Sequence, residues 1–301
     1  MKIGFAAPIS GSWATPDIVR RLIRRAEDRG YHSTWTFQRL LFPTGGGIPE
    51  VYRSVQDPIV TLSYLAGQTS RIRLGLGVVN MPFVSPTLLA KQLASLDILS
   101  SGRLDVGLGL GWSKDEFIAS GAPYAGRGRR AEEFMSALRT LWTETVVEHR
   151  GDFYELPPAQ MNPKPVQRPH PPILLGASAE PALRRAGRLA DGWISSSRAD
   201  LTALGGAIAT VKSAARAAGR DPERLRFVCR GVVLVRTPGD PNRRPLTGSL
   251  EEIKGDFGVI RDQGVTELFL DLNYDPEIGS PDADADKATR RAEDVIDACA
   301  P

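Results

Sequence analysis

The chain has 301 residues, of which 42% are hydrophobic and 24% charged, the balance of a globular protein with a large buried core. Its 38 basic and 35 acidic residues are interspersed and leave a net charge of +3, so no basic block could follow a nucleic-acid backbone. Cys229 and Cys299 lie far apart and outside any Cys/His ligand spacing, so we expect neither a disulfide framework nor a metal site.

No apolar run reaches the ~18 residues of a membrane span. The N-terminal segment MKIGFAAPISG is too short for a signal peptide with a cleavage site. These features predict a cytoplasmic protein that does not contact a membrane. A length of 301 residues exceeds that of an average domain, but α/β barrels reach it as one unit, so we expect a single domain over residues 1–301.

Short apolar runs alternate with amphipathic stretches along the chain, which is typical of βα units around a parallel sheet. Eight strands are predicted, at residues 2–6, 33–37, 72–79, 104–109, 173–175, 192–195, 227–235 and 267–272. Eight helices are predicted, at residues 16–28, 58–68, 86–99, 130–142, 181–189, 201–218, 250–263 and 288–298. Several of these helices begin with proline, which the first helical turn favours. The pattern predicts an α/β fold, the closed (β/α)8 TIM barrel.

Residues 145–172 interrupt this alternation. The segment is rich in proline and shows no hydrophobic periodicity. A long insertion inside a compact domain is more often a functional lid than a linker. We therefore expect a loop-rich insertion between the fourth and fifth predicted strands, and we interpret it as a cover for the site.

Two features suggest an anion site at the C-terminal mouth of the barrel. Gly176, Ala177 and Ser178 follow the fifth predicted strand and begin a helix, where backbone N–H groups can converge on a phosphate. A plain tight turn would explain the same three residues. Arg198 follows the sixth predicted strand and could add a charge-assisted contact, although a solvated arginine is the alternative.

Residues 57–112 read DPIVTLSYLAGQTSRIRLGLGVVNMPFVSPTLLAKQLASLDILSSGRLDVGLGLGW. This segment resembles the luciferase-like monooxygenase superfamily, as do GDFYELPPAQMNPKPVQRPHPPILLGAS, RLADGWISSS and LTGSLEEIKGDFGVIRDQGVTELFL. The likeness covers nearly the whole chain and is nearest to the deazaflavin branch, whose members use coenzyme F420. It implies a cofactor at the C-terminal mouth of the barrel, a small-molecule substrate and a homodimer.

The resemblance also implies which residues contact the cofactor. In this family the ring system lies over the strand ends, and the third strand carries a bulge with a non-prolyl cis peptide bond. The matching bond here joins Gly77 to Val78, so Gly77, Val78 and Val79 are expected to contact the cofactor. A glycine-rich strand that simply packs tightly would have the same sequence. The family likeness further favours Gly176 to Ser178, with Arg198, as the site of the cofactor phosphate.

Aromatic and amide side chains are expected to line the rest of the site. Trp112 follows the fourth predicted strand, where a large ring can support a flat heterocycle, although core packing is the alternative. Trp13 and Phe37, after the first strand and at the end of the second, are predicted walls of the substrate pocket. Gln38 and Asn80 are its predicted polar groups.

The sequence departs from the family's dehydrogenases at the acid–base positions. Those enzymes place a histidine after the second strand and an acid after the fourth, where this chain has Gln38, Arg39 and Trp112. Glutamine can orient a substrate but cannot exchange a proton near neutral pH. Of the three histidines only His149, in the insertion, could reach the mouth. No catalytic acid or base is therefore predicted.

Three functions follow. F420-dependent hydride transfer is preferred, because the likeness is nearest to the deazaflavin branch. A monooxygenase that uses reduced FMN is the alternative, and the missing acid–base residues also leave open a non-catalytic flavin-binding barrel.

Other charged residues are expected to be structural. Asp97 and Arg103 are predicted to pair and fix the loop before the fourth strand. Asp115 and Glu116 are interpreted first as helix-dipole residues. The arginines of the first predicted helix should form a solvated charged face, and these are Arg20, Arg21, Arg24, Arg25 and Arg29.

Overall fold

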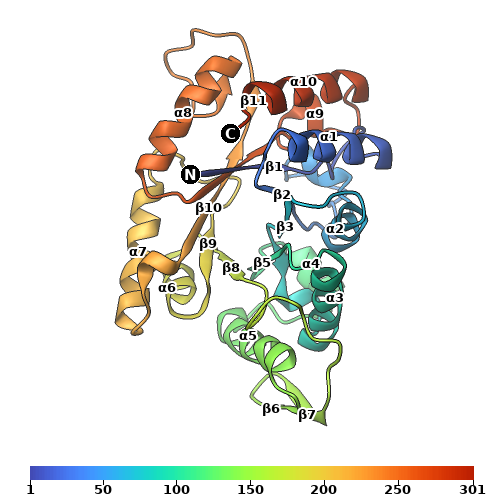
Figure 1. Cartoon of the computed structure of the whole chain (residues 1–301), viewed down its shortest axis with the longest axis vertical. Coiled ribbons are helices and arrows are strands. Elements are labelled where there is room, and N and C mark those ends of the chain that lie inside the picture. The colour runs from blue at the N-terminus through green and yellow to red at the C-terminus, as the bar shows by residue number, and fades with distance from the viewer.

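Parallel strands close into a barrel in the computed structural model, which describes residues 1–301 (Figure 1). The strands are β1 (Lys2–Ala6), β2 (Ser33–Thr36), β3 (Arg73–Leu76), β4 (Val79–Asn80), β5 (Leu104–Gly109), β8 (Ile173–Gly176), β9 (Gly192–Ile194), β10 (Arg226–Val232) and β13 (Glu267–Asp271). Their order is β3-β2-β1-β13-β10-β9-β8-β5-β4. The pairing of β3 with β5, at Leu74 and Leu104, closes the circle. The predicted TIM barrel is confirmed.

One long helix follows each barrel position and packs outside it (Figure 1). These helices are α1 (Pro16–Asp28), α2 (Pro58–Ala66), α3 (Pro86–Leu99), α5 (Arg127–Thr143), α6 (Glu180–Leu189), α7 (Leu204–Ala217), α8 (Leu250–Asp262) and α10 (Ala285–Ala298). Two short helices, α4 (Lys114–Ala119) and α9 (Pro276–Gly279), and three 3-10 turns at Glu50–Arg53, Met81–Phe83 and Pro222–Arg224 lie in the connections. None of the helices combines the length and the apolar character that crossing a bilayer requires.

Three of the long helices begin in the same way. A polar residue at the N-cap precedes proline in the first turn, and its side chain accepts a backbone hydrogen bond from that turn: Thr15 in α1, Asp57 in α2 and Ser85 in α3. Proline has no N–H to leave unsatisfied at this position, and the cap satisfies one of the remaining donors. The sequence therefore fixes these helix starts locally, and the predicted starts at residues 16, 58 and 86 are correct.

The third predicted strand is divided. β3 ends at Leu76 and β4 begins at Val79, and the Gly77–Val78 peptide bond between them is cis, as the family likeness implies. Apart from this division, the predicted strand and helix bounds differ from the structure by at most three residues.

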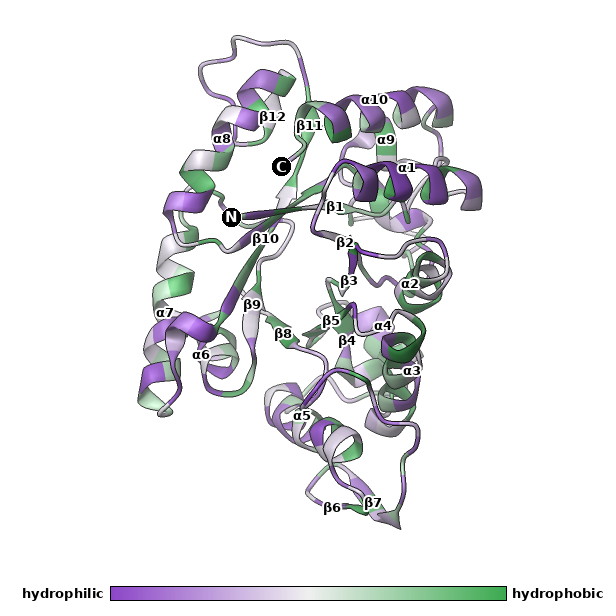
Figure 2. Cartoon of the chain, viewed as in Figure 1, coloured by the Kyte–Doolittle hydropathy of each residue, from purple (hydrophilic) through white to green (hydrophobic).

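Two apolar layers hold the barrel together. The large cluster lies between the strands and the helices. The helices are hydrophilic on the side that faces away from it, as α1 and α10 show (Figure 2). A second cluster fills the barrel interior with strand residues alone: Ala6, Trp35, Leu174, Ile194, Val228 and Phe269. Trp35 stacks on Phe269 with ring centroids 5.2 Å apart. It fits because Gly75 has no side chain, since a Cβ there would lie 2.3 Å from the Trp35 ring.

A buried ion network lies at the N-terminal ends of the strands. Asp105 is fully buried and receives hydrogen bonds from Arg73 at 2.7 Å and from Arg226 at 2.6 Å. Arg226 also donates to Glu267 at 2.9 Å. Burial by itself would raise the pKa of Asp105, but the hydrogen bonds from Arg73 and the charge of Arg226 outweigh it, and the net pKa is lowered. This end of the barrel is therefore closed by charge pairing.

The expectation that the insertion covers the site is wrong. Residues 145–172 include an antiparallel hairpin, β6 (Val147–Arg150) with β7 (Glu155–Ala159), which was not predicted. The hairpin follows α5 and lies at the far end of the molecule from α8 (Figure 1). The segment then crosses the N-terminal end of the barrel, where the Gln167 side chain donates to the Leu104 carbonyl. His149 contacts Glu133 of α5 at 3.4 Å, and no residue of 145–172 lines the cavity at the C-terminal mouth.

Asp97 and Arg103 do not pair, contrary to the expectation, although both have structural roles. Asp97 accepts hydrogen bonds from the backbone of Val166 and Gln167 and so anchors the insertion. Arg103 donates to the carbonyl groups of Ala66 and Thr69 at the end of α2 and to those of Ile72 and Ser100. Each side chain therefore fixes a different loop.

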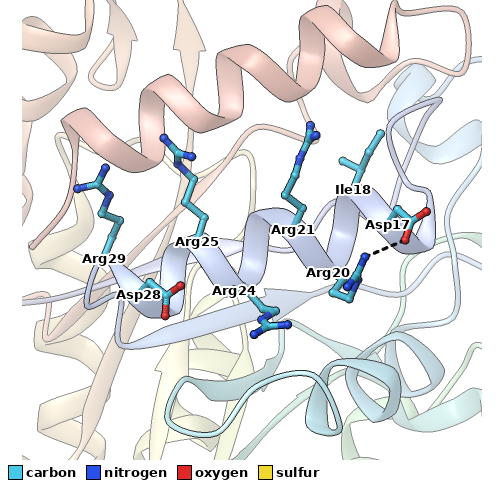
Figure 3. A pocket seen from close by; sticks show the side chains of 8 residues that line it. All are labelled: Asp17, Ile18, Arg20, Arg21, Arg24, Arg25, Asp28 and Arg29. Atoms are coloured by element: carbon cyan, nitrogen blue, oxygen red, sulfur yellow. Dashed lines mark hydrogen bonds and ion pairs between the residues drawn. The ribbon is translucent and has the colours of Figure 1, made fainter.

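The arginines of α1 lie along a hollow of about 610 Å³, as Figure 3 shows. Arg25 and Arg29 bind Asp297 of α10, and Arg21 binds Glu293 at 3.3 Å. The hollow is remote from the strand ends and Ile18 is its one apolar lining residue. It is therefore a charged helix contact, and the predicted solvated face is in part engaged with α10.

A small pair of strands, β11 (Leu234–Val235) and β12 (Thr247–Gly248), flanks the loop after β10. Within this loop Arg243 binds Asp256 of α8 through two hydrogen bonds of 2.7 and 2.9 Å. The Asp256 carboxylate also accepts from the backbone N–H of Leu246. The loop is thus held against α8 beside the mouth of the barrel.

Candidate cofactor and substrate site

A cavity of about 360 Å³ opens at the C-terminal ends of the strands, the mouth where barrel enzymes carry their sites. Its wall comes from residues at or after the ends of β2, β3, β4, β5, β8, β9 and β13, and from Arg230 within β10. The lining includes these predicted site residues: Phe37, Gln38, Gly77, Val78, Asn80, Trp112, Gly176, Ala177 and Ser178. The structure therefore brings together groups that are separated along the sequence.

Val79 and Trp13 lie outside the cavity. Successive side chains of a strand point to opposite faces, so Val78 contacts the interior cluster while Val79, 1% exposed, belongs to the outer cluster between strands and helices. Trp13 is completely buried in that same outer cluster. The alternation of side chains along the strand could have shown from the sequence that Val79 does not line the cavity. Nothing in the sequence indicates that Trp13 is buried rather than at the mouth.

The cavity floor is built from Val78 and the glycines around it. A Cβ on Gly109 would lie 2.6 Å from Val78 Cγ2, and one on Gly176 would lie 3.1 Å from Val78 Cγ1. Side chains at these positions would displace Val78 from the floor. Small residues thus leave a flat surface on which a planar ring can lie close to the backbone.

Gln38 ties β2 to β4 across this floor. Its backbone N–H donates to the Val78 carbonyl at 3.3 Å, and its Oε1 accepts hydrogen bonds from the Asn80 backbone N–H at 2.9 Å and from Asn80 Nδ2 at 3.2 Å. The side-chain carbonyl oxygen of Gln38 therefore already accepts hydrogen bonds within the protein. Its amide nitrogen donates no hydrogen bond within the chain and remains available to a ligand.

One side of the cavity has the features of an anion site. Ser178 and Ala179 lie between β8 and the first turn of α6, and their backbone N–H groups donate to no protein acceptor. Trp193 of β9 donates from its indole to the Ala177 carbonyl at 2.8 Å and holds this turn in place. Arg127, at the start of α5, lines the same cavity. Free donors at a helix N-terminus together with a guanidinium suit a phosphate.

Arg198 lines a second cavity, of about 480 Å³, rather than the first. The two cavities share Ser197 and Arg230, so they adjoin beyond β9. The second cavity is lined by three arginines, Arg198, Arg230 and Arg244, and by one acid, Asp200. Arg198 also lies 5.5 Å from the Trp112 ring, which lines the first cavity. The predicted cation is therefore next to the proposed phosphate position, not in it.

The opposite side of the cavity is aromatic. Phe37, Tyr52 and Tyr274 pack against one another with ring centroids 5.5 to 6.2 Å apart. The hydroxyl groups of Tyr52 and Tyr274 are 3.0 Å apart, and burial raises the pKa of Tyr274 well above its usual value, so that hydroxyl stays protonated. Trp112 is 46% exposed at the rim and packs on Tyr52 at 6.2 Å.

Sequence reasoning assigned no role in the site to several lining residues: Arg39, Tyr52, Arg127, Arg230 and Tyr274. Arg230 had a usable signal, because a charged residue interrupts the apolar run of a predicted barrel strand. Glu116 was interpreted as a helix-dipole residue, yet its side chain is fully buried and lies 2.9 Å from Arg39. Tyr52 and Tyr274 come from loops whose course the sequence does not indicate.

A TIM barrel with a glycine-floored cavity beside a helix N-terminus is the framework of a cofactor-binding barrel. Residues 1–247 match the family model of the luciferase-like monooxygenases, and the chain belongs to that family. The predicted family is thereby confirmed, and it is a family of oxidoreductases and monooxygenases.

The chain is similar to curated relatives over about half of their length. An uncharacterized protein of Mycobacterium tuberculosis is 41% identical over 148 residues, 49% of this chain and 52% of the relative. The FMNH2-dependent dimethylsulfone monooxygenase of Pseudomonas putida is 36% identical over 179 residues, 58% of this chain and 47% of the relative.

Solved structures share the fold over nearly the whole chain. The monooxygenase RslO1 from Streptomyces bottropensis superposes with a TM-score of 0.79 at 24% identity, covering 99% of this chain and 98% of that one. An F420-dependent secondary alcohol dehydrogenase, solved with an F420–acetone adduct, gives a TM-score of 0.79 at 18% identity with the same coverage. These similarities support the barrel and not a particular cofactor.

Proposed function

We propose that this protein is an F420-dependent oxidoreductase that transfers a hydride between the deazaflavin and an organic substrate. The observation that carries the proposal is the basic cavity that adjoins the anion site. F420 continues beyond its phosphate into an anionic tail, whereas FMN ends at the phosphate. The second cavity offers room and the positive charges of Arg198 and Arg244 at that point.

The residues of the first cavity fit the remaining parts of such a cofactor. The glycine floor around Val78 accommodates a flat ring, and Ser178, Ala179 and Arg127 would hold the phosphate. When bound, the deazaflavin supplies the hydride chemistry, and the protein contributes orientation, exclusion of water and electrostatics. The protonated hydroxyl of Tyr274 and the amide nitrogen of Gln38 are the neutral donors that can orient a substrate oxygen.

A monooxygenase that uses reduced FMN is the second candidate. It is favoured by the 36% identity to a Pseudomonas putida relative that is named for FMNH2 dependence. The same floor and helix N-terminus would hold FMN, and the second cavity would then have no part in cofactor binding. A non-catalytic barrel that only binds the cofactor is distinguished from both by the absence of substrate turnover.

Titration of the purified protein with F420, FMN and FAD side by side tests the proposal. We expect F420 to bind at least tenfold more tightly than FMN, which corresponds to a difference of about 1.4 kcal/mol. Equal or reversed affinities would favour the monooxygenase. Failure of all three to bind would exclude both enzymes.

A further inference from the structure

Two arginines are buried in the aromatic half of the cavity. Arg39, after β2, and Arg230, in β10, are each only 7% exposed, and both line the cavity. Three of their guanidinium nitrogens face no protein acceptor: Nε and Nη1 of Arg39, and Nη2 of Arg230. Buried charged groups are normally paired and hydrogen-bonded, so unmet donors at a ligand cavity indicate acceptors that arrive with a ligand.

Arg39 is held rigidly. Its guanidinium lies between two rings, 4.9 Å from the centroid of Tyr52 and 4.6 Å from that of Trp112. Its Nη2 atom lies 2.9 Å from Oε2 of Glu116, and the other Glu116 oxygen accepts backbone hydrogen bonds from Leu40 and Leu41. Glu116 thus fixes both the side chain and the loop that carries it. Such fixation lowers the entropic cost of forming further hydrogen bonds.

Arg230 is held in a similar way by the same aromatic cluster. Its guanidinium lies 5.0 Å from the centroid of Phe37 and 5.3 Å from that of Tyr274. Its Nε atom lies 3.1 Å from a carboxylate oxygen of Asp271, which is completely buried. These contacts place the Arg230 guanidinium against rings that follow β2 and β13, where the first cavity adjoins the second.

We propose that Arg39 and Arg230 form the binding site for a carboxylate group of the substrate, whose apolar body packs on Phe37 and Tyr274. The proposal rests on the function proposed above. Each guanidinium carries five N–H donors and already faces one protein carboxylate, so its remaining donors can donate to a second carboxylate. The cofactor phosphate would have its own donors at Ser178 and Ala179, which lie between β8 and α6.

Glu116 is a positioning residue in this site, because it acts on the substrate through Arg39. Its removal alone would leave Arg39 without its protein carboxylate, and removal of Arg39 alone would leave a fully buried carboxylate unpaired. The informative variant is therefore the double substitution Arg39→Met with Glu116→Gln, which removes both charges and keeps the approximate side-chain volumes. Thermal unfolding verifies that it is folded.

The test is an isothermal titration with benzoate and with benzamide, its uncharged analogue of the same shape, using protein saturated with its cofactor. We expect benzoate to bind the native protein at least tenfold more tightly than benzamide. The double variant should lose this preference while its affinity for the cofactor stays within twofold. Arg24→Met, on the outer helix α1, is the matched arginine control and should retain the preference.

The outcomes separate this proposal from the function on which it rests. Equal affinities for benzoate and benzamide in the native protein, or an unchanged preference in the folded double variant, would overturn the carboxylate site. Loss of cofactor affinity in the double variant would also overturn it, since the arginines would then serve the cofactor. The cofactor titrations of the native protein decide the proposed function independently, because they do not involve benzoate.

Discussion

The indole nitrogen of Trp193 donates a 2.8 Å hydrogen bond to the carbonyl oxygen of Ala177. Trp193 is 3% exposed, and Ala177 belongs to the turn that connects β8 to α6. The bond links β9 to the segment whose free N–H groups face the cavity. The sequence motif ADGW therefore contributes to the anion site without lining the cavity itself.

Replacing Trp193 with Phe should loosen this turn. A neutral hydrogen bond contributes about 0.5–1.5 kcal/mol to stability, and the Ala177 carbonyl would lose its partner. We expect a small decrease in the melting temperature and a decrease in cofactor affinity of up to about tenfold, since the donors are less well ordered. Calorimetric titration measures the affinity. A folded variant with native affinity would show that the turn holds its position without Trp193.

Gly75 and Gly77 lie in the same segment but should respond differently to substitution by alanine. At Gly75 a Cβ would overlap the buried Trp35 ring at 2.3 Å, so we expect a loss of about 1–3 kcal/mol or more in the free energy of unfolding. At Gly77 the nearest atom is the end of the Ile194 side chain, at 3.1 Å, which can move. Urea unfolding of the two variants should give a clearly lower midpoint for Gly75→Ala only.

A larger side chain at Gly77 should affect the site rather than the fold. In Gly77→Val the branched side chain would push against Ile194, which lines the cavity together with Gly77, and so narrow the space of a planar ring. We expect a folded barrel that binds neither F420 nor FMN at concentrations that saturate the native protein. Retained binding of either cofactor would place its ring elsewhere in the cavity.

The sequence was sufficient for the barrel and for the glycines that line the floor of the cavity. Proline after a capping residue fixes the start of α1, α2 and α3, and the run of glycines around Val78 identifies the floor. The caps are local features, whereas the floor glycines Gly77, Gly109 and Gly176 come from separate strand ends. The family likeness added the position of the bulge at Gly77, which no periodicity reveals.

The aromatic side of the cavity, which we propose binds the substrate, could not be predicted because it depends on contacts between residues far apart in the sequence. Arg39 and Glu116 are far apart in the sequence, and only the closed barrel brings β2 beside the connection that follows β5. The position of the insertion, residues 145–172, was predicted wrongly for a related reason. Its composition indicates a loop, but its attachment through Asp97 and Gln167 to the N-terminal end of the barrel is a tertiary feature.

The stability of the barrel should depend on pH through Asp105. Its pKa is lowered in the folded protein, so its contribution to stability is complete above the usual carboxyl pKa of about 3.9 and is lost as the pH falls below that value. Asp105→Asn removes one partner of a buried ion network and should cost about 3–5 kcal/mol at pH 7. The difference between native and variant should shrink toward pH 3.

Urea unfolding at pH 7 and pH 3 measures this difference. Asp17→Asn is the matched control, because the Asp17 side chain is 90% exposed and pairs only with the neighbouring Arg20. Its effect should be small at both pH values. A constant deficit for Asp105→Asn between the two pH values would mean that the native protein does not rely on the ionised carboxylate.

The last prediction concerns the choice between F420 and FMN. If the second cavity holds the anionic tail of F420, then Arg198→Ala and Arg244→Ala should each lower the affinity for F420 by roughly tenfold, because each removes one charge-assisted contact. Neither should change the affinity for FMN, which ends at its phosphate. Arg127→Ala should lower the affinity for both cofactors, since Arg127 lines the first cavity beside the turn before α6.

Salt provides an independent check on the same variants. Arg198 and Arg244 are exposed, so their attraction for an anion is screened as the ionic strength rises, whereas the backbone donors of Ser178 and Ala179 remain. The loss of F420 affinity in these variants should therefore be largest at low salt and should diminish at high salt. Equal effects of Arg198→Ala on F420 and FMN would instead place Arg198 at the phosphate itself. Unchanged affinities for both cofactors at low salt would remove the second cavity from cofactor binding and, with it, the observation that favours F420.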